Sequence, residues 1–94
     1  MPYLLIRHKV AHYPKWKRAF DGHGHARKSG GSKGGQLFRN AARPKDVFIL
    51  LQWNDLRRAK TFAKSADLRK AMKGAGVRGR PDVFFLHESA RTTR

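Results

Sequence analysis

The segment Val47–Trp53, with the sequence VFILLQW, predicts a β-strand that is apolar on both of its sides. Successive side chains of a strand point to opposite faces of the sheet. One side of this strand carries Val47, Ile49, Leu51 and Trp53, and the other carries Phe48, Leu50 and Gln52. A sheet built around such a strand needs a packing partner on each face, because proteins in water rarely expose a continuous apolar surface.

Three further strands and two helical segments are predicted from the spacing of apolar residues. In chain order, we expect a strand at Tyr3–Val10, a helix from about Pro14 to Arg27, a flexible connector at Ser29–Gly35, a strand at Gln36–Asn40, a turn at Ala41–Asp46, the strand at Val47–Trp53, a helical segment capped by Asn54 or Asp55 and ended by Gly74 and Gly76, and a strand at Asp82–Glu88. Residues 89–94 form a basic tail, which we expect to be mobile.

Both helical segments contain a predicted weak point. Gly22 and Gly24 flank His23 in the first segment, and each glycine inside a helix costs about 1 kcal/mol relative to alanine. Ser65 and Asp67 are typical of a second N-cap inside the other segment. We therefore expect a break at Ser65 and a short helical continuation after it.

The predicted order βαββαβ packs two helices on one face of a four-stranded antiparallel sheet, which is an α+β architecture. A chain of 94 residues is long enough for a single domain, spanning residues 1–94. Two helices cover one face of the sheet only, whereas the strand at Val47–Trp53 is apolar on both. We therefore expect a homodimer in which the uncovered sheet faces of two subunits pack together.

The amino-acid composition limits the cellular compartment of the protein and the kinds of functional site that it can contain. The chain has no cysteine, which excludes disulfides, thiolate metal sites and a cysteine nucleophile, and which fits a cytoplasmic protein. No stretch approaches the roughly 20 apolar residues needed to cross a bilayer. Arg7, His8 and Lys9 interrupt the region where a signal peptide stays apolar. We expect neither a membrane span nor a targeting segment.

Several stretches of the sequence carry a resemblance to a known family. They are the opening strand PYLLIRHKV, the helix YPKWKRAFDGHGHAR, the pair SKGGQLFRN and DVFILLQW, and the segment NDLRRAKTFAKSADLRKAM. Over residues 2 to about 88, the chain resembles the antibiotic biosynthesis monooxygenase-type dimeric α/β-barrel proteins, a branch of the ferredoxin-like folds. The resemblance implies two subunits that join their sheets into a barrel, with a pocket between sheet and helices. It also implies small-molecule chemistry, such as cofactor-free oxygenation of aromatic compounds, haem degradation or isomerisation.

Haem degradation fits this sequence poorly. Relatives with that activity use an asparagine on the first strand, a tryptophan near the third and a histidine on the second helix. Trp53 matches the tryptophan, but the first strand offers His8, and Phe62 stands near the position of the expected histidine. We therefore expect a protein that acts, if it is an enzyme, without a metal or an organic cofactor.

The residues capable of acid–base chemistry converge on the predicted pocket. His23 and Arg27 lie four residues apart on one side of the first helix, and Phe20 directs that side toward the sheet. His8 lies on the same strand face as Ile6. A histidine can exchange a proton near neutral pH, and an arginine can hold an enolate or phenolate oxygen. The candidate catalytic residues are His23, Arg27 and His8, and the candidate substrate-binding residues are Trp16, Trp53, Arg39 and Phe20.

Simpler roles remain open for the same residues. Histidine and tryptophan on an apolar stripe often pack in the core, and Arg27 and Arg39 can extend to solvent. His23 and His25 point to different sides of a helix, so they do not share a metal ion. On this alternative, the domain is a non-catalytic ligand carrier.

The charge of the chain supports a further class of function. Lysine and arginine number 22 against six acids, and the resulting formal charge of +16 attracts polyanions. The second helical segment offers nucleic acid a basic surface, formed by Arg57, Arg58, Lys60, Lys64, Arg69, Lys70 and Lys73. The order βαββαβ also occurs in RNA-recognition domains, but the strand VFILLQW lacks their aromatic motif.

Overall fold

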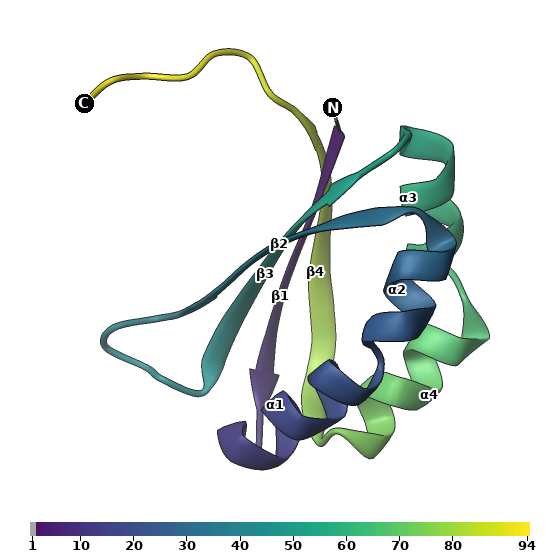
Figure 1. The fold of residues 1–94 in the computed structure, drawn as a ribbon. Helices are drawn as coiled ribbons and strands as arrows, with labels where there is room; N and C mark the ends of the chain where they lie inside the picture. The colour runs from purple at the N-terminus through teal and green to yellow at the C-terminus, as the bar shows by residue number, and fades with distance from the viewer. Residues whose placement is uncertain (1) are drawn as a thin grey trace.

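The computed structural model describes residues 2–94 and has two layers, a sheet and a set of helices on one of its faces (Figure 1). Its elements are β1 (Pro2–Val10), α1 (Tyr13–Gly22), α2 (Gly24–Gly30), β2 (Ser32–Arg39), β3 (Asp46–Trp53), α3 (Leu56–Ala63), α4 (Ala66–Gly74) and β4 (Val77–His87). The four strands form one antiparallel sheet in the order β2-β3-β1-β4. The expected βαββαβ architecture is confirmed, with each helical segment divided into two helices.

The core lies between the helices and the two central strands. Cross-strand neighbours Leu4 and Leu51, and Ile6 and Ile49, point to the helix-covered face, and all four are at most 4% exposed. Full burial of such a side chain stabilises the fold by about 1.5–3 kcal/mol. The alternation of β1 and β3 thus fixes which face of the sheet receives the helices.

Both predicted weak points are breaks between helices. At the second break, the Ser65 hydroxyl accepts a hydrogen bond from the backbone N–H of Leu68 and caps α4. The side chain of Asp55 caps α3 in the same way, through the N–H of Arg58. At the first break, His23 is the last residue bonded to α1, and its own carbonyl accepts from Arg27 in α2.

The segment Ser29–Gly35 was expected to be a flexible connector, and that prediction is wrong. Its first part completes α2, Gly31 ends that helix with a φ of 115°, and β2 begins at Ser32. A Cβ atom at Gly35 would overlap the carbonyl oxygen of Leu50 on β3. Glycine is required there because two strands approach closely, a role that composition does not distinguish from flexibility.

The last strand starts at Val77, earlier than the expected Asp82. Gly79 and Pro81, residue types that disfavour a strand, lie in this first part of β4. However, β4 is at the edge of the sheet, where proline and a glycine with a φ of 71° are tolerated. The pairing of β4 with β1 shifts register between Arg7 and Lys9, opposite this irregular part.

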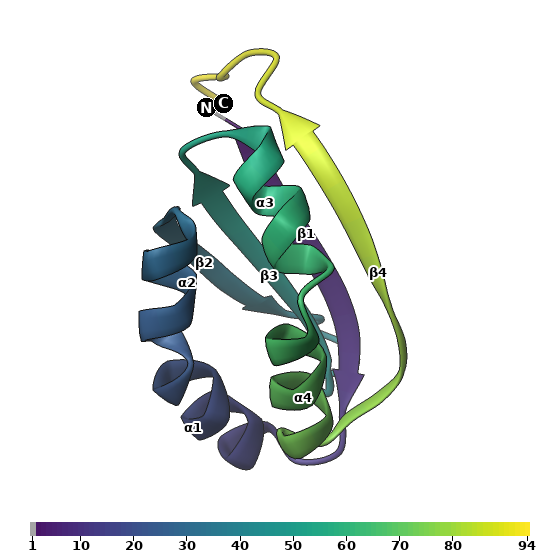
Figure 2. The same cartoon turned by 90° about the vertical axis from the view of Figure 1, so that its right-hand side faces the viewer.

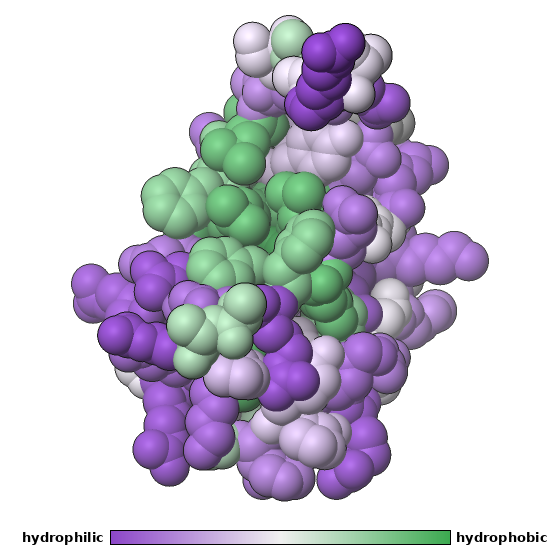
Figure 3. Space-filling view, turned by 90° about the vertical axis from the view of Figure 1, so that its left-hand side faces the viewer, coloured by the Kyte–Doolittle hydropathy of each residue, from purple (hydrophilic) through white to green (hydrophobic). Residues whose placement is uncertain are grey.

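The other face of the sheet carries no helix and presents an apolar patch surrounded by hydrophilic residues (Figure 3). We call it the open sheet face, and its apolar members are Leu5, Phe38, Phe48, Leu50, Phe84 and Leu86. Phe38 and Phe84 are about half exposed. The sequence expectation that β3 would leave an apolar face without cover is therefore confirmed for the single subunit.

Candidate functional site

A cavity lies between the sheet and the helices. Its volume is about 40 Å³, which is room for about three water molecules. Apolar side chains from β3, α3 and α4 line one part of it. The more polar part is lined by His8 from β1, Trp16 and Phe20 from α1, His23 from the break between α1 and α2, and Arg27 from α2.

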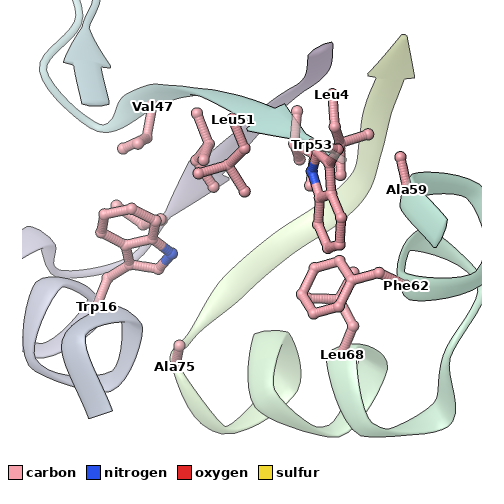
Figure 4. Packing of buried hydrophobic residues seen from close by; sticks show 12 residues of the cluster. Leu4, Trp16, Val47, Leu51, Trp53, Ala59, Phe62, Leu68 and Ala75 are labelled. Carbon is pink, nitrogen blue, oxygen red and sulfur yellow. The ribbon is translucent and has the colours of Figure 1, made fainter. Parts of the chain in front are cut away.

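Aromatic rings form the wall on the α1 side. The ring of Trp16 stacks on that of Phe20, with centroids 5.1 Å apart, and meets the imidazole of His8 edge-on at 5.5 Å. Figure 4 shows Trp16 on one side of the interior, with Phe62 and Leu68 on the other. All three side chains line the cavity. These flat and branched surfaces suit a ligand with an aromatic or alicyclic body.

His8 supplies the polar group buried deepest in the cavity. The residue is 5% exposed, and among residues 2–94 neither ring nitrogen has a hydrogen-bond partner. Burial lowers the pKa of His8 to about 4, against a smaller opposing effect of the charge of Asp46. The ring is therefore neutral at pH 7, with one nitrogen able to donate a hydrogen bond and the other able to accept one.

Arg27 places a cation at the edge of the same cavity. Its guanidinium carbon lies 3.6 Å from the centroid of the Phe20 ring, and one terminal nitrogen donates a 2.8 Å hydrogen bond to the Phe20 carbonyl. Partial burial lowers the pKa of Arg27, but an arginine stays protonated at neutral pH. The guanidinium has five N–H donors, so the remaining ones are available to an anionic oxygen.

His23 is held by a residue that the sequence did not indicate. Its Nε2 atom lies 2.8 Å from Oδ2 of Asp67, which belongs to the first turn of α4. The sequence pointed to Asp67 only as part of a helix cap. No pattern along the chain connects the two residues, because they are 44 positions apart. A carboxylate bonded to one imidazole nitrogen orients the ring and selects its tautomer.

The other two candidate residues lie outside the cavity. Trp53 is fully buried in the core and packs its ring 5.0 Å from that of Phe62. Arg39 lies over the ring of Tyr13 at 3.9 Å and donates a hydrogen bond to the carbonyl of Pro44. The fold thus brings together five of the seven predicted side chains, namely His8, Trp16, Phe20, His23 and Arg27.

The structure contains no group of three or more metal-binding side chains anywhere in the described chain, Pro2–Arg94. Over the same residues, no helix is long and apolar enough to cross a membrane. The ionisable side chains that line the cavity are those of His8, His23 and Arg27.

No protein-family profile and no curated protein sequence matches the chain. Solved structures do match. A protein assigned as an antibiotic biosynthesis monooxygenase from Bordetella bronchiseptica superposes with a TM-score of 0.78 at 16% identity, over 95% of this chain and 97% of that one. SnoaB, a cofactor-independent oxygenase from Streptomyces nogalater, gives 0.70 at 14%, over 98% and 94%. Rv0793 from Mycobacterium tuberculosis gives 0.66 at 10%, over 99% and 100%. At these identities the likeness concerns the fold, and it confirms the ferredoxin-like fold that the resemblance implied.

Proposed function

We propose that this chain binds a small molecule in the cavity between sheet and helices, and that it acts on that molecule as a homodimer. The observation that carries the proposal is His8. A buried polar group without a hydrogen bond costs the fold about 1–3 kcal/mol, and native structures contain few of them. Two such nitrogens on one ring, facing a cavity with a cationic edge, offer a ligand one hydrogen-bond donor and one acceptor.

The polar groups suit a proton-transfer reaction. His23, oriented by Asp67, accepts a proton from a carbon next to a carbonyl group or from a phenol. The oxygen of the substrate then carries the negative charge, and the guanidinium of Arg27 and the N–H of His8 stabilise it. Return of the proton to another atom of the substrate isomerises it, which is the reaction of an isomerase. Reaction of the carbanion with dioxygen as co-substrate gives an oxygenase, the activity that the structurally similar SnoaB carries in its name.

Ligand entry requires the cavity to widen. A volume of about 40 Å³ is too small for an aromatic ring, since drug-sized ligands occupy pockets of roughly 300–1,000 Å³. The break at His23, between Gly22 and Gly24, is the point where α1 and α2 can change their angle. Separation of His23 from Asp67 would open the cavity between α2 and α4.

The open sheet face supports the homodimer. Its apolar patch is continuous and flanked by hydrophilic residues, as at a protein interface (Figure 3). The same face of a second subunit covers the patch. The paired sheets then support the sheet side of each cavity. The dimer leaves both helical layers outside, so the cavities stay accessible.

The test uses 2-tetralone, an aromatic ketone with exchangeable α-protons, in D₂O. We expect the protein to accelerate deuterium incorporation at the α-carbon, followed by NMR. His23→Ala and Arg27→Ala each reduce the rate by a factor of about 100 or more, the usual contribution of such groups. The matched control is Arg39→Ala, which removes an arginine outside the cavity and leaves the rate unchanged.

Binding is measured separately, by the fluorescence of Trp16 in a Trp53→Phe background. Binding of 2-tetralone without deuterium exchange would assign the cavity to a carrier protein. If 2-tetralone, phenol and 1-naphthol all fail to change the fluorescence of Trp16 or the NMR signals of His8, the proposed binding site is wrong.

A further inference from the structure

Most of the basic residues of this protein have no acidic partner. Each of the six acidic residues lies within 4 Å of a basic side chain, including the exposed pairs Lys17–Asp21 and Arg91–Glu88. Only four of the 22 lysine and arginine residues take part in these pairs, which are Arg7, Lys17, Arg58 and Arg91. Subtracting four from 22 leaves 18 cations without an acidic partner among residues 2–94.

Seven exposed cations belong to α3, α4 and the turn between them, and the two helices follow one another along the side of the molecule (Figure 2). Arg57, Lys60 and Lys64 line a surface hollow beside α3. The other exposed cations of this surface are Arg58, Arg69, Lys70 and Lys73. The acids on it are Asp55 and Asp67, and both are engaged in capping or pairing. We call these seven basic residues the basic helical surface.

We propose that the basic helical surface binds the phosphate backbone of double-stranded nucleic acid, without reading its sequence. The proposal does not depend on the cavity. Arg57 to Lys64 spans about 10 Å of helix axis at 1.5 Å per residue. One strand of a duplex places about three phosphates in that length, at 3.4 Å each. Three cations along one hollow can therefore each meet a phosphate.

The lack of an exposed aromatic ring on α3 and α4 points to a duplex. Proteins that bind single strands stack the bases on aromatic side chains. The one aromatic residue of α3 and α4 is Phe62, which is 8% exposed and packs in the core. The half-exposed rings of Phe38 and Phe84 lie on the opposite side of the molecule, on the open sheet face. Cations without a stacking surface bind the backbone alone.

The same helices do not suit a membrane surface. A helix that lies in a bilayer inserts an apolar side between the lipids. In α3 and α4 the apolar side faces the sheet, where Ala59, Phe62 and Leu68 are buried. The exposed residues of these helices are mostly charged, which favours a partner that is itself a rigid array of charges.

The test measures binding to two 20-base-pair DNA duplexes of unrelated sequence, by fluorescence anisotropy at 50 and 200 mM KCl. We expect equal affinity for both. Each phosphate contact contributes about −0.9 to the slope of log K against log salt, so three contacts give at least about a 40-fold loss over this range. Arg57→Gln, Lys60→Gln and Lys64→Gln together should reduce that slope by about 3.

The matched control removes the same charge elsewhere. Arg43→Gln, Lys45→Gln and Arg80→Gln change three exposed cations outside the helices, and we expect less than a threefold change in affinity. Circular dichroism verifies that both triple variants fold. The proposal is overturned by equal losses in the two variants, by no binding at 50 mM KCl, by tighter binding of a single strand, or by preference for vesicles of anionic lipid.

Discussion

The Nε2 atom of His23 and the Oδ2 atom of Asp67 are 2.8 Å apart, and this contact joins the break between α1 and α2 to the start of α4. It spans the two halves of the helical layer beside the cavity. His23 is largely buried, whereas Asp67 is 70% exposed. The bond is thus accessible to water from one side, where a carboxylate can leave at low cost.

Replacing Asp67 with alanine is expected to loosen the region around His23 without unfolding the protein. An ion pair with an exposed partner contributes at most about 1 kcal/mol, so the melting temperature changes little. Hydrogen exchange of the amides at residues 23–27 increases, because α2 loses its tie to α4. The comparison is Glu88→Ala, which removes the exposed pair with Arg91 near the C-terminus. Equal exchange in both variants would show that the contact does not hold α2 in place.

Replacing His8 with leucine is expected to stabilise the protein and abolish ligand binding. Leucine has a similar volume and removes two buried nitrogens that have no partner. The free energy of unfolding rises by about 1–3 kcal/mol, measured by urea denaturation at pH 7. Binding of 2-tetralone falls in the same variant. A loss of stability would mean that His8 makes a favourable hydrogen bond in the unliganded protein.

The stability of the wild-type protein is expected to fall between pH 6.5 and 4. Burial lowers the pKa of His8 to about 4 in the folded state, so the unfolded chain binds a proton first as the pH decreases. The loss reaches about 3 kcal/mol at most and levels off below pH 4. The hydrogen bond from Arg7 lowers the pKa of Asp46. The contribution of Asp46 to stability is lost only when the pH falls below the usual pKa of a carboxylate. Urea denaturation of wild type and His8→Leu at several pH values isolates the histidine, because the variant lacks the decrease.

Replacing Phe84 with glutamate is expected to convert a dimer into monomers. Phe84 is half exposed in the single subunit, so folding tolerates the change. In the dimer, the carboxylate of the new glutamate would be buried between the paired sheets without a cationic partner. Light scattering gives the mass. Val83→Glu is the control, because Val83 is also partly exposed but points to the other side of β4. A wild-type monomer at high protein concentration would contradict the dimer.

Replacing Gly35 with alanine is expected to destabilise the protein by several kcal/mol, since the new methyl group overlaps the carbonyl of Leu50. Gly74→Ala is the control. At Gly74 a Cβ meets nothing within 4 Å, and alanine favours the helix, so that variant gains up to about 1 kcal/mol. Thermal denaturation of the two variants shows opposite shifts.

These glycines also show how far the sequence predicts the fold. Alternation placed β1 and β3 correctly because burial selects every second residue, and the cap at Ser65 located the break in the second helical segment. Gly35 misled, because a glycine that allows close approach and a glycine that gives flexibility look alike in a sequence. The residue that packs against the glycine in the folded protein decides between the two roles.

For the site, helical spacing and strand alternation were sufficient to predict that His8, His23 and Arg27 face one cavity. Local periodicity gives the direction of a side chain but not its depth along the strand. Trp53 points to the helix-covered face as expected. However, it lies at the end of β3, where it packs against α3 outside the cavity. Asp67 was missed because its contact with His23 depends on how two helices cross, which no local pattern encodes.

The unpaired imidazole of His8 also provides a way to search for the natural ligand without knowing the reaction. A compound that bonds to the imidazole nitrogens of His8 gains those hydrogen bonds in addition to the usual stabilisation by mass action. Compounds with a hydrogen-bond donor and acceptor next to an apolar body should therefore raise the melting temperature of the wild type more than that of His8→Leu. A thermal-shift screen of metabolites against both proteins in parallel would rank candidates by that difference.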